Sequence, residues 1–275
     1  MMLRGRMTFG ASMRCIKLIA IVLCTSASMS VIAQIKSGFS DKADLAPDVV
    51  RSGSYFLAES TRQLQNDGFA NPGLLWVDRG KALFEDNTGA ASCRSCHETG
   101  LAGVFARFPA YEPKLKKLLN IEGRINQCRT QHQALSPLPY ESNTLLSLTA
   151  YVASQSKDRP FNVSVKGGAK EHFDRGREYF FARRGQLNLA CTQCHDDYWG
   201  RMLRGDRISQ GHSNAYPAYR LEWQSMGSLH RRFADCDIGV RAAAFEPGSP
   251  EYVELELYLA WRSANLPIES PGVRR

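Results

Sequence analysis

Apolar residues recur at helical spacing in two well-separated segments of the chain. Residues 141–156, ESNTLLSLTAYVASQS, and residues 250–264, PEYVELELYLAWRSA, each place apolar side chains every three or four positions, which is the period of one helix face. Both segments contain the pattern Y-x-A, at Tyr151 and at Tyr258. The pattern predicts two helices that are related by an internal repeat.

Two pentapeptides read C-x-x-C-H: CRSCH and CTQCH. Two thiols on one helical turn can form thioethers with a haem, and the adjacent histidine then faces the iron, so the motif is typical of c-type haem attachment. A zinc site or a redox dithiol is the alternative for an isolated motif, but the chain has no further C-x-x-C to complete zinc sites. The sequence predicts two covalently bound haem c groups, attached through Cys93, Cys96, Cys191 and Cys194, with His97 and His195 as iron ligands.

The repeat also extends to the residues before each motif. DRGK with Phe84 precedes the first motif, and DRGR with Phe180 precedes the second. In a cytochrome c fold this is the helix that packs against the C-terminal helix, and its glycine, here Gly80 or Gly176, permits close approach. We therefore expect a mainly α fold with two tandem cytochrome c domains, whose helix aromatics lie in the core.

The remaining segments suggest the domain organisation. Residues 1–33 run from basic to apolar to small side chains and end in V-I-A, as in a cleaved secretory signal peptide, so we expect the mature protein in the periplasm. An N-terminal helical extension and the first cytochrome c domain then occupy residues 34–157, and the second domain occupies residues 158–275. The stretch 156–170, rich in charge, Pro and Gly, is typical of a linker.

Charge and cysteine content change once the signal peptide is set aside. The formal net charge of +8 includes four basic and no acidic side chains from residues 1–33, so it falls to +4, and we expect no nucleic acid partner. Of the eight cysteines, Cys15 and Cys24 lie in that segment and six remain. Three disulfides would be the default in an exported chain, but four of these thiols belong to the haem motifs.

Each haem iron has a second axial position that electron carriers often fill with methionine. Beyond residue 33 the only methionines are Met202 and Met226, so the first domain has none. Its candidates are Cys128, His132 or no protein ligand.

The repeat favours cysteine at both irons. Cys128 lies 23 residues before Tyr151 and Cys236 lies 22 before Tyr258, and an arginine stands four residues before each cysteine. We therefore predict Cys128 and Cys236 as iron ligands. The alternatives are a disulfide between them, or Met226 or His230 at the second haem.

A thiolate ligand has chemical consequences. It stabilises ferric iron, and such a sulfur can also act as a nucleophile. Arg232, four residues before Cys236, could donate hydrogen bonds to an anionic substrate beside that sulfur.

The motifs together resemble the SoxA family, the dihaem cytochrome subunits of SoxAX in the Sox sulfur-oxidation system. The resemblance covers TRQLQNDGFANPG, both C-x-x-C-H motifs, GRINQCR, RRFADCDIGVRA and YLAWRSANLPIESPGVR. It implies an L-cysteine S-thiosulfotransferase that joins thiosulfate oxidatively to a cysteine of the SoxYZ carrier. Two electrons would pass through haem to the SoxX monohaem subunit and then to soluble cytochrome c. The resemblance also implies that Cys236 is the catalytic cysteine, found as a persulfide, and that Arg232 binds substrate.

Two other functions remain open from the sequence. A thiosulfate dehydrogenase would release tetrathionate instead of leaving the product on a protein carrier. A dihaem electron-transfer cytochrome would need no catalytic cysteine and no Arg232 beside it.

Overall fold

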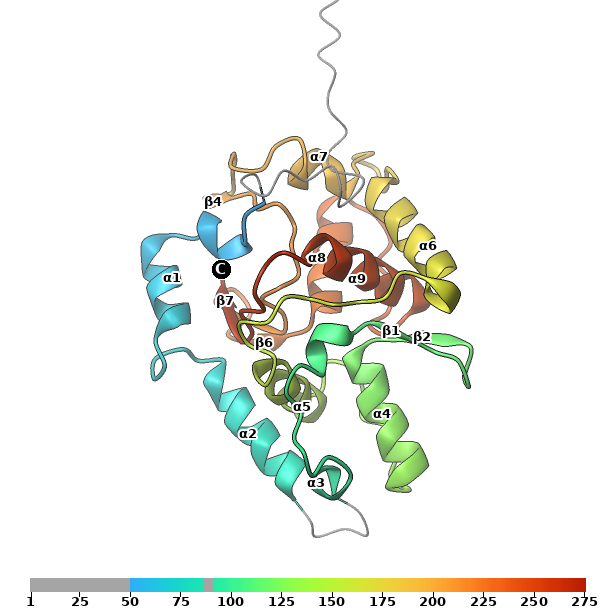
Figure 1. Cartoon of the computed structure of the whole chain (residues 1–275). Coiled ribbons are helices and arrows are strands. Elements are labelled where there is room, and N and C mark those ends of the chain that lie inside the picture. Colours follow the sequence, from blue (N-terminus) through green and yellow to red (C-terminus); the bar gives the residue numbers. More distant parts are fainter. Residues whose placement is uncertain (1–49, 87–91) are drawn as a thin grey trace, which may run out of the picture. The chain divides into compact units, whose positions relative to one another are not determined.

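The computed structural model describes residues 50–86 and 92–275, and most of the regular structure in them is helical (Figure 1). The predicted signal peptide lies outside the described residues. Within the described ranges, no helix is long and apolar enough to cross a membrane. The helical prediction is confirmed, whereas the three small sheets described below had no counterpart in the prediction.

The N-terminal extension is helical and docks on the end of the chain. A short 3-10 helix, η2 (Gly53–Phe56), precedes α1 (Glu59–Asn66). The carbonyl oxygen of the Gln65 side chain accepts from the backbone N–H of Val273 at 3.1 Å. The Asn71 side chain donates to the carbonyl of Pro271 at 3.0 Å. These bonds hold the extension against β7 (Gly272–Arg274), a long-range contact that the local pattern did not predict.

Each predicted helix pair forms and is packed in the same way. In the first half, α2 (Leu74–Glu85) packs on α5 (Asn143–Ser154). A Cβ added at Gly80 would lie 1.9 Å from the carbonyl oxygen of Ser147. In the second half, α6 (Lys170–Phe181) packs on α9 (Pro250–Arg262), and a Cβ at Gly176 would lie 2.0 Å from the carbonyl oxygen of Glu254. Only glycine allows this backbone contact, as the sequence predicted.

The aromatic residues of the repeat lie in the core of each half. The ring centroids of Phe84 and Tyr151 are 5.3 Å apart, and those of Phe180 and Tyr258 are also 5.3 Å apart. All four side chains are buried. The prediction of core packing for these aromatics is therefore confirmed.

Helices and short strands carry the chain between the paired helices. In the first half these elements are α3 (Cys93–Cys96), η3 (Phe105–Arg107), β1 (Ala110–Glu112), β2 (Lys117–Leu119) and α4 (Ile121–His132). In the second half they are α7 (Cys191–His195), β3 (Met202–Leu203), β4 (Asp206–Arg207), β5 (Ala218–Arg220), β6 (Ser225–Gly227) and α8 (Leu229–Gly239). β1 pairs with β2 and β3 with β4, both antiparallel, while β5 lies between antiparallel β6 and parallel β7.

The segment between the halves is irregular apart from η4 (Gly167–Ala169), but it is not a free spacer. Phe161 is buried, and its ring centroid lies 5.9 Å from that of Phe105. The backbone N–H of Asn162 donates to the carbonyl of Ala106 at 2.7 Å. The segment thus packs onto the first half, because its apolar residues cover a core that the Pro and Gly content did not reveal. The exact domain boundary stays a prediction.

Candidate haem centres and reactive cysteine

The first C-x-x-C-H motif forms one helical turn, α3. The Ser92 hydroxyl accepts from the backbone N–H of Ser95 at 3.0 Å and caps the turn, as an N-cap serine does. Cys93 is partly buried while Cys96 is exposed. His97 follows at the end of the turn, with its ring centroid 6.4 Å from that of Phe84. The motif therefore places both thiols on one turn, as thioether attachment requires.

The second motif forms α7 and is more deeply enclosed. The Gln193 side chain accepts from the backbone N–H of Ala190 at 2.7 Å and fixes the start of the turn. Burial, followed by the charge of Cys236, raises the pKa of Cys191 to about 12. The same two causes raise the pKa of Cys194. Cys236 thus lies near both thiols of the second motif.

The first half brings its lone cysteine to its own motif in the same way. Burial raises the pKa of Cys128 on α4, against the opposing effect of Arg124 and with a further increase from Cys96. The pKa of Cys93 is raised by burial, and the charge of Cys128 adds to that rise. The structure therefore places Cys128 with Cys93 and Cys96, as the repeat predicted.

The alternative ligands for the second haem have other partners. The His230 Nδ1 accepts from the backbone N–H of Gly248 at 2.9 Å, and its Nε2 lies 2.9 Å from a carboxylate oxygen of Glu256. Met226 is buried and packs against Leu146 and Ala150 of α5. Both side chains are thus engaged in contacts within the protein, and as iron ligands they stay alternatives.

The structure also places the alternative ligand of the first half and the cysteines of the alternative disulfide. His132 is exposed at the end of α4. The six cysteines within the described ranges are all free, and Cys128 and Cys236 lie beside different motifs.

The surroundings of His195 fit a haem ligand. Its Nδ1 lies 2.7 Å from the carbonyl oxygen of Ser209, so Nδ1 carries the proton and Nε2 is left with a lone pair for iron. This hydrogen bond to a backbone carbonyl is the usual second partner of a metal-bound histidine. Burial lowers the pKa of His195 to about 4, with smaller contributions from Arg232 and Arg262, which favours the neutral ring that a metal requires.

Arg232 and Arg124 occupy equivalent places but have different surroundings. The Arg124 guanidinium donates to Glu112 at 3.1 Å and to the Gln127 side chain at 2.6 Å. The Arg232 guanidinium makes no hydrogen bond or ion pair with any residue in the described ranges, and the charge of Cys236 is the main cause of its raised pKa. An unbonded guanidinium beside a sulfur has donors available for an anionic ligand.

A polar network that the sequence did not indicate holds the end of α8. Asp237, which follows Cys236, is buried. Its Oδ2 accepts from the Tyr179 hydroxyl at 2.6 Å and from the Tyr252 hydroxyl at 2.9 Å, and its Oδ1 accepts from Arg184 at 3.2 Å. These bonds fix Asp237 to α6 and α9. The signal in the sequence was a pair of acids flanking the cysteine, Asp235 and Asp237, and spacing alone does not show which of them is buried.

A buried ion pair lies next to His195 and was also missed. Asp196 accepts from Arg262 at 2.6 Å, and each side chain is only 1% exposed. The Arg262 guanidinium also lies 4.6 Å from the centroid of the Phe180 ring. The internal repeat gave one indication of this ion pair. The position four residues after Tyr258 is Arg262, whereas the equivalent position four residues after Tyr151 is the uncharged Gln155.

The fold and the motifs define a c-type cytochrome with two equivalent halves. Residues 79–161 match the family model described as the SoxA/TsdA cytochrome c domain. The protein carries covalently bound haem c, since this attachment defines the cytochrome c domain.

Known proteins resemble the chain over most of its length. It is 36% identical to the L-cysteine S-thiosulfotransferase subunit SoxA of Pseudaminobacter salicylatoxidans, over 82% of this chain and 80% of that protein. It is 35% identical to the subunit of the same name from Rhodovulum sulfidophilum, over 82% and 81% of the two chains. The crystal structure of SoxXA from P. pantotrophus superposes with a TM-score of 0.78 at 35% identity, covering 82% of this chain and 87% of the other.

The chain therefore belongs to the SoxA family. This membership confirms the resemblance that the motifs indicated and the mainly helical cytochrome c fold. The enzyme class that accompanies it, L-cysteine S-thiosulfotransferase, is the one that the sequence predicted.

Proposed function

We propose that this protein catalyses the oxidative conjugation of thiosulfate to a cysteine of a SoxYZ carrier. The observation that carries the proposal is the juxtaposition on α8 of Cys236 with an arginine that has no partner in the described residues, beside the second C-x-x-C-H motif. The names of the relatives support the reaction class.

The reaction joins two sulfur nucleophiles, so it must be oxidative. A carrier thiol and thiosulfate give a thiosulfonated cysteine, one proton and two electrons. The S–H bond of the carrier breaks and an S–S bond forms. A bound haem supplies an acceptor for electrons next to the reacting sulfur.

The residues of this chain provide the binding and the nucleophile. Arg232 binds the sulfonate end of thiosulfate through its guanidinium and holds the anion against the Cys236 sulfur. Cys236 carries the sulfur chemistry as a persulfide. Asp237 is a positioning residue, because its three hydrogen bonds fix the last turn of α8 and hence the direction of the cysteine.

The cofactors in this proposal are two haem c groups. Cys93 and Cys96 attach the first, with His97 and Cys128 as its iron ligands. The second is attached through Cys191 and Cys194, with His195 and Cys236 as ligands. What supports this set is that each lone cysteine lies at its own motif and that the His195 ring is oriented by Ser209.

The partners and the location complete the proposal. SoxXA, the name of the superposed structure, supports a heterodimer with a SoxX monohaem cytochrome, which passes electrons to soluble cytochrome c. Removal of residues 1–33 on export would place the protein in the periplasm.

Carrier thiosulfonation in a reconstituted mixture tests this function. The holoprotein with its SoxX partner, SoxYZ, thiosulfate and oxidised cytochrome c is expected to add thiosulfate to the carrier, and Cys236→Ala is expected to stop the addition. Glu59→Gln, at an exposed residue of α1 in the N-terminal extension, is the control and keeps the activity. Unchanged thiosulfonation by Cys236→Ala would contradict the proposal, and release of tetrathionate without carrier labelling would favour a thiosulfate dehydrogenase.

A further inference from the structure

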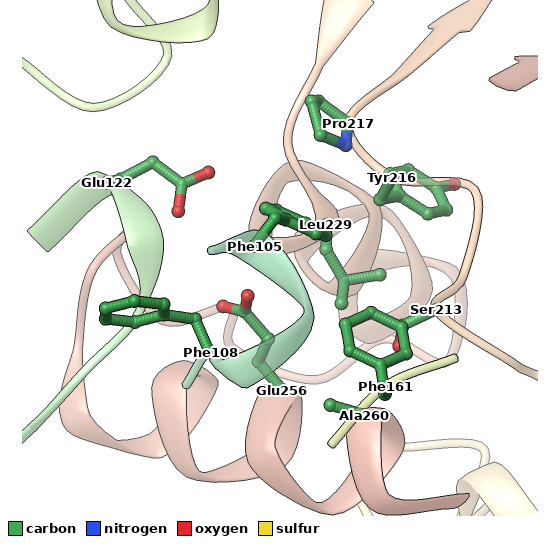
Figure 2. A pocket seen from close by; sticks show the side chains of 10 residues that line it. All are labelled: Phe105, Phe108, Glu122, Phe161, Ser213, Tyr216, Pro217, Leu229, Glu256 and Ala260. Atoms are coloured by element: carbon green, nitrogen blue, oxygen red, sulfur yellow. The ribbon is translucent and has the colours of Figure 1, made fainter. Parts of the chain in front are cut away.

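A small cavity lies between residues of the two halves, and no residue of either C-x-x-C-H motif lines it. Glu122 of α4 and Glu256 of α9 line it, with Phe105, Phe108 and Leu229 among its apolar walls. Figure 2 shows the two carboxyl groups turned toward the same space. The cavity volume is about 20 Å³, and a polar cavity of this size can hold one water molecule.

Glu122 is a buried carboxyl group with an unused oxygen. It is only 6% exposed, and its Oε2 has no hydrogen-bond partner in the described residues. Burial, followed by the charge of Glu256, raises the pKa of Glu122 well above its ordinary value. The protonated form is therefore favoured, and its O–H needs an acceptor because an unpaired buried donor is costly.

Glu256 accepts hydrogen bonds, whereas the protonated Glu122 donates one. The backbone N–H of Gly248 donates to His230 Nδ1, so Nε2 carries the ring proton and donates to Glu256 Oε2 at 2.9 Å. The Asn120 side chain donates to the same oxygen at 3.2 Å. One oxygen of Glu256 thus accepts two hydrogen bonds. The cavity thus has a proton donor on α4 and an acceptor on α9.

The internal repeat gives this cluster its position. Glu122 stands six residues before Cys128 on α4, and His230 stands six before Cys236 on α8. Six residues of helix span about 9 Å. The cluster therefore joins the first turns of both cysteine-bearing helices to Glu256, at a site that the proposed haem and substrate chemistry does not use.

We propose that this cavity binds one water molecule and one proton, with Glu122 donating its O–H to the water and the water donating to Glu256. The site links α4 of the first half to α8 and α9 of the second through a single hydrogen-bonded chain. No electron or covalent bond is exchanged. The proposal goes beyond the sulfur chemistry and does not depend on it.

Loss of the Glu122 proton is expected to lower the free energy of unfolding. The titratable groups around Glu122 are Glu256, Glu141, Tyr140 and, bonded to Glu256, His230, and the charges of Glu256 and Glu141 both add to the rise in the pKa of Glu122. The folded state binds the Glu122 proton more tightly than the unfolded chain, so its stabilising effect is complete below about pH 4.5, the ordinary value, and is lost as the pH rises through the folded pKa. Over that window, the unfolding constant is expected to rise by up to tenfold per pH unit.

Infrared spectroscopy of the holoprotein tests the proton directly. The parent is expected to show the carbonyl band of a buried protonated carboxyl group, with a shift in D₂O. Glu122→Gln is expected to abolish that band, and Glu256→Gln to shift it by removing the acceptor. Glu85→Gln, at an exposed glutamate of α2, is the control and leaves the band unchanged. Absence of the band in the parent, or its persistence unchanged in either cavity variant, would overturn the shared proton.

Two further measurements test whether these residues bind a proton and a water molecule or only pack the helices together. Urea unfolding between pH 5 and 8 is expected to show a smaller pH dependence in Glu122→Gln than in the parent or in Glu85→Gln; equal slopes would contradict the proposal. A crystal structure of the holoprotein is expected to show an ordered water within hydrogen-bond distance of Glu122 Oε2. An empty cavity there would overturn the water site.

Discussion

The two halves of the protein share a frame but differ around their lone cysteines. Each half packs a glycine-containing helix on a Y-x-A helix and brings one cysteine to a C-x-x-C-H motif. In the first half Arg124 is bonded to Glu112 and Gln127. In the second half Arg232 has no such partner in the described residues, and Asp237 ties the cysteine helix to two neighbouring helices.

Under the proposed function, this difference separates holding a haem from acting on a substrate. The shared contacts form the frame that a cytochrome c domain needs. The contacts found only in the second half provide an unbonded cation and a fixed cysteine, which are the requirements for binding an anion beside a nucleophile. A duplicated domain can thus acquire a reactive site by changing few side chains, while its backbone contacts stay the same.

The largest effect, on the rate with thiosulfate, is expected at Arg232, with the equivalent Arg124 as the comparison. Arg232→Ala is expected to reduce kcat/KM for thiosulfate on the order of 10²–10³-fold, as for loss of a donor that stabilises charge at a reacting centre. Arg124→Ala is expected to leave the KM for thiosulfate unchanged, because its guanidinium is bonded within the first half. Steady-state rates with varied thiosulfate measure both. Equal losses in the two variants would remove the proposed difference between the halves.

A smaller effect, on the unfolding free energy, is expected when the buried ion pair between Asp196 and Arg262 is broken. Arg262→Gln gives the second half the residue found at Gln155 and leaves Asp196 without its cation. Breaking such a pair from one side costs about 3 kcal/mol of unfolding free energy, and Asp196→Asn in the same chain is expected to restore part of it. Urea unfolding of the holoprotein measures the loss, with exposed Gln155→Ala as control. A loss below about 1 kcal/mol would show that the pair adds little.

The smallest effect is expected at Asp237. Asp237→Asn keeps the size but removes the charge that accepts from Tyr179, Tyr252 and Arg184, so the unfolding free energy is expected to fall by about 1 kcal/mol. Arg129→Ala tests the equivalent position of the first half, where the side chain is bonded to the Ser136 carbonyl near the surface. Here we expect a change within about 0.5 kcal/mol, and similar losses at both positions would contradict the asymmetry.

The sequence predicted most of the shared frame. Helical spacing located α5 and α9, and the repeat correctly placed Gly80 and Gly176 at helix contacts, because both signals are local or are repeated within the chain. The repeat also placed Cys128 and Cys236 at equivalent positions of the two halves, and their role as iron ligands stays a prediction. These features could be predicted because each leaves a pattern at fixed spacing.

The features that distinguish the halves were harder to predict. The Asp237 hydrogen bonds and the contact of Asp196 with Arg262 join residues far apart in the sequence, and single residues carry no periodic signal. The packing of Phe161 onto the first half was missed because Pro and Gly indicated a linker. Long-range side-chain contacts depend on the finished fold, so they can be recognised only in the structure.

Intact-mass spectrometry of the mature protein, purified with its native partner, tests the central claim most directly. We predict the mass of the chain plus two haems plus one labile sulfur, with that sulfur absent in Cys236→Ala and retained in Cys128→Ala. Two haems without added sulfur, together with unchanged carrier thiosulfonation in Cys236→Ala, would contradict the claim and leave both halves as electron carriers.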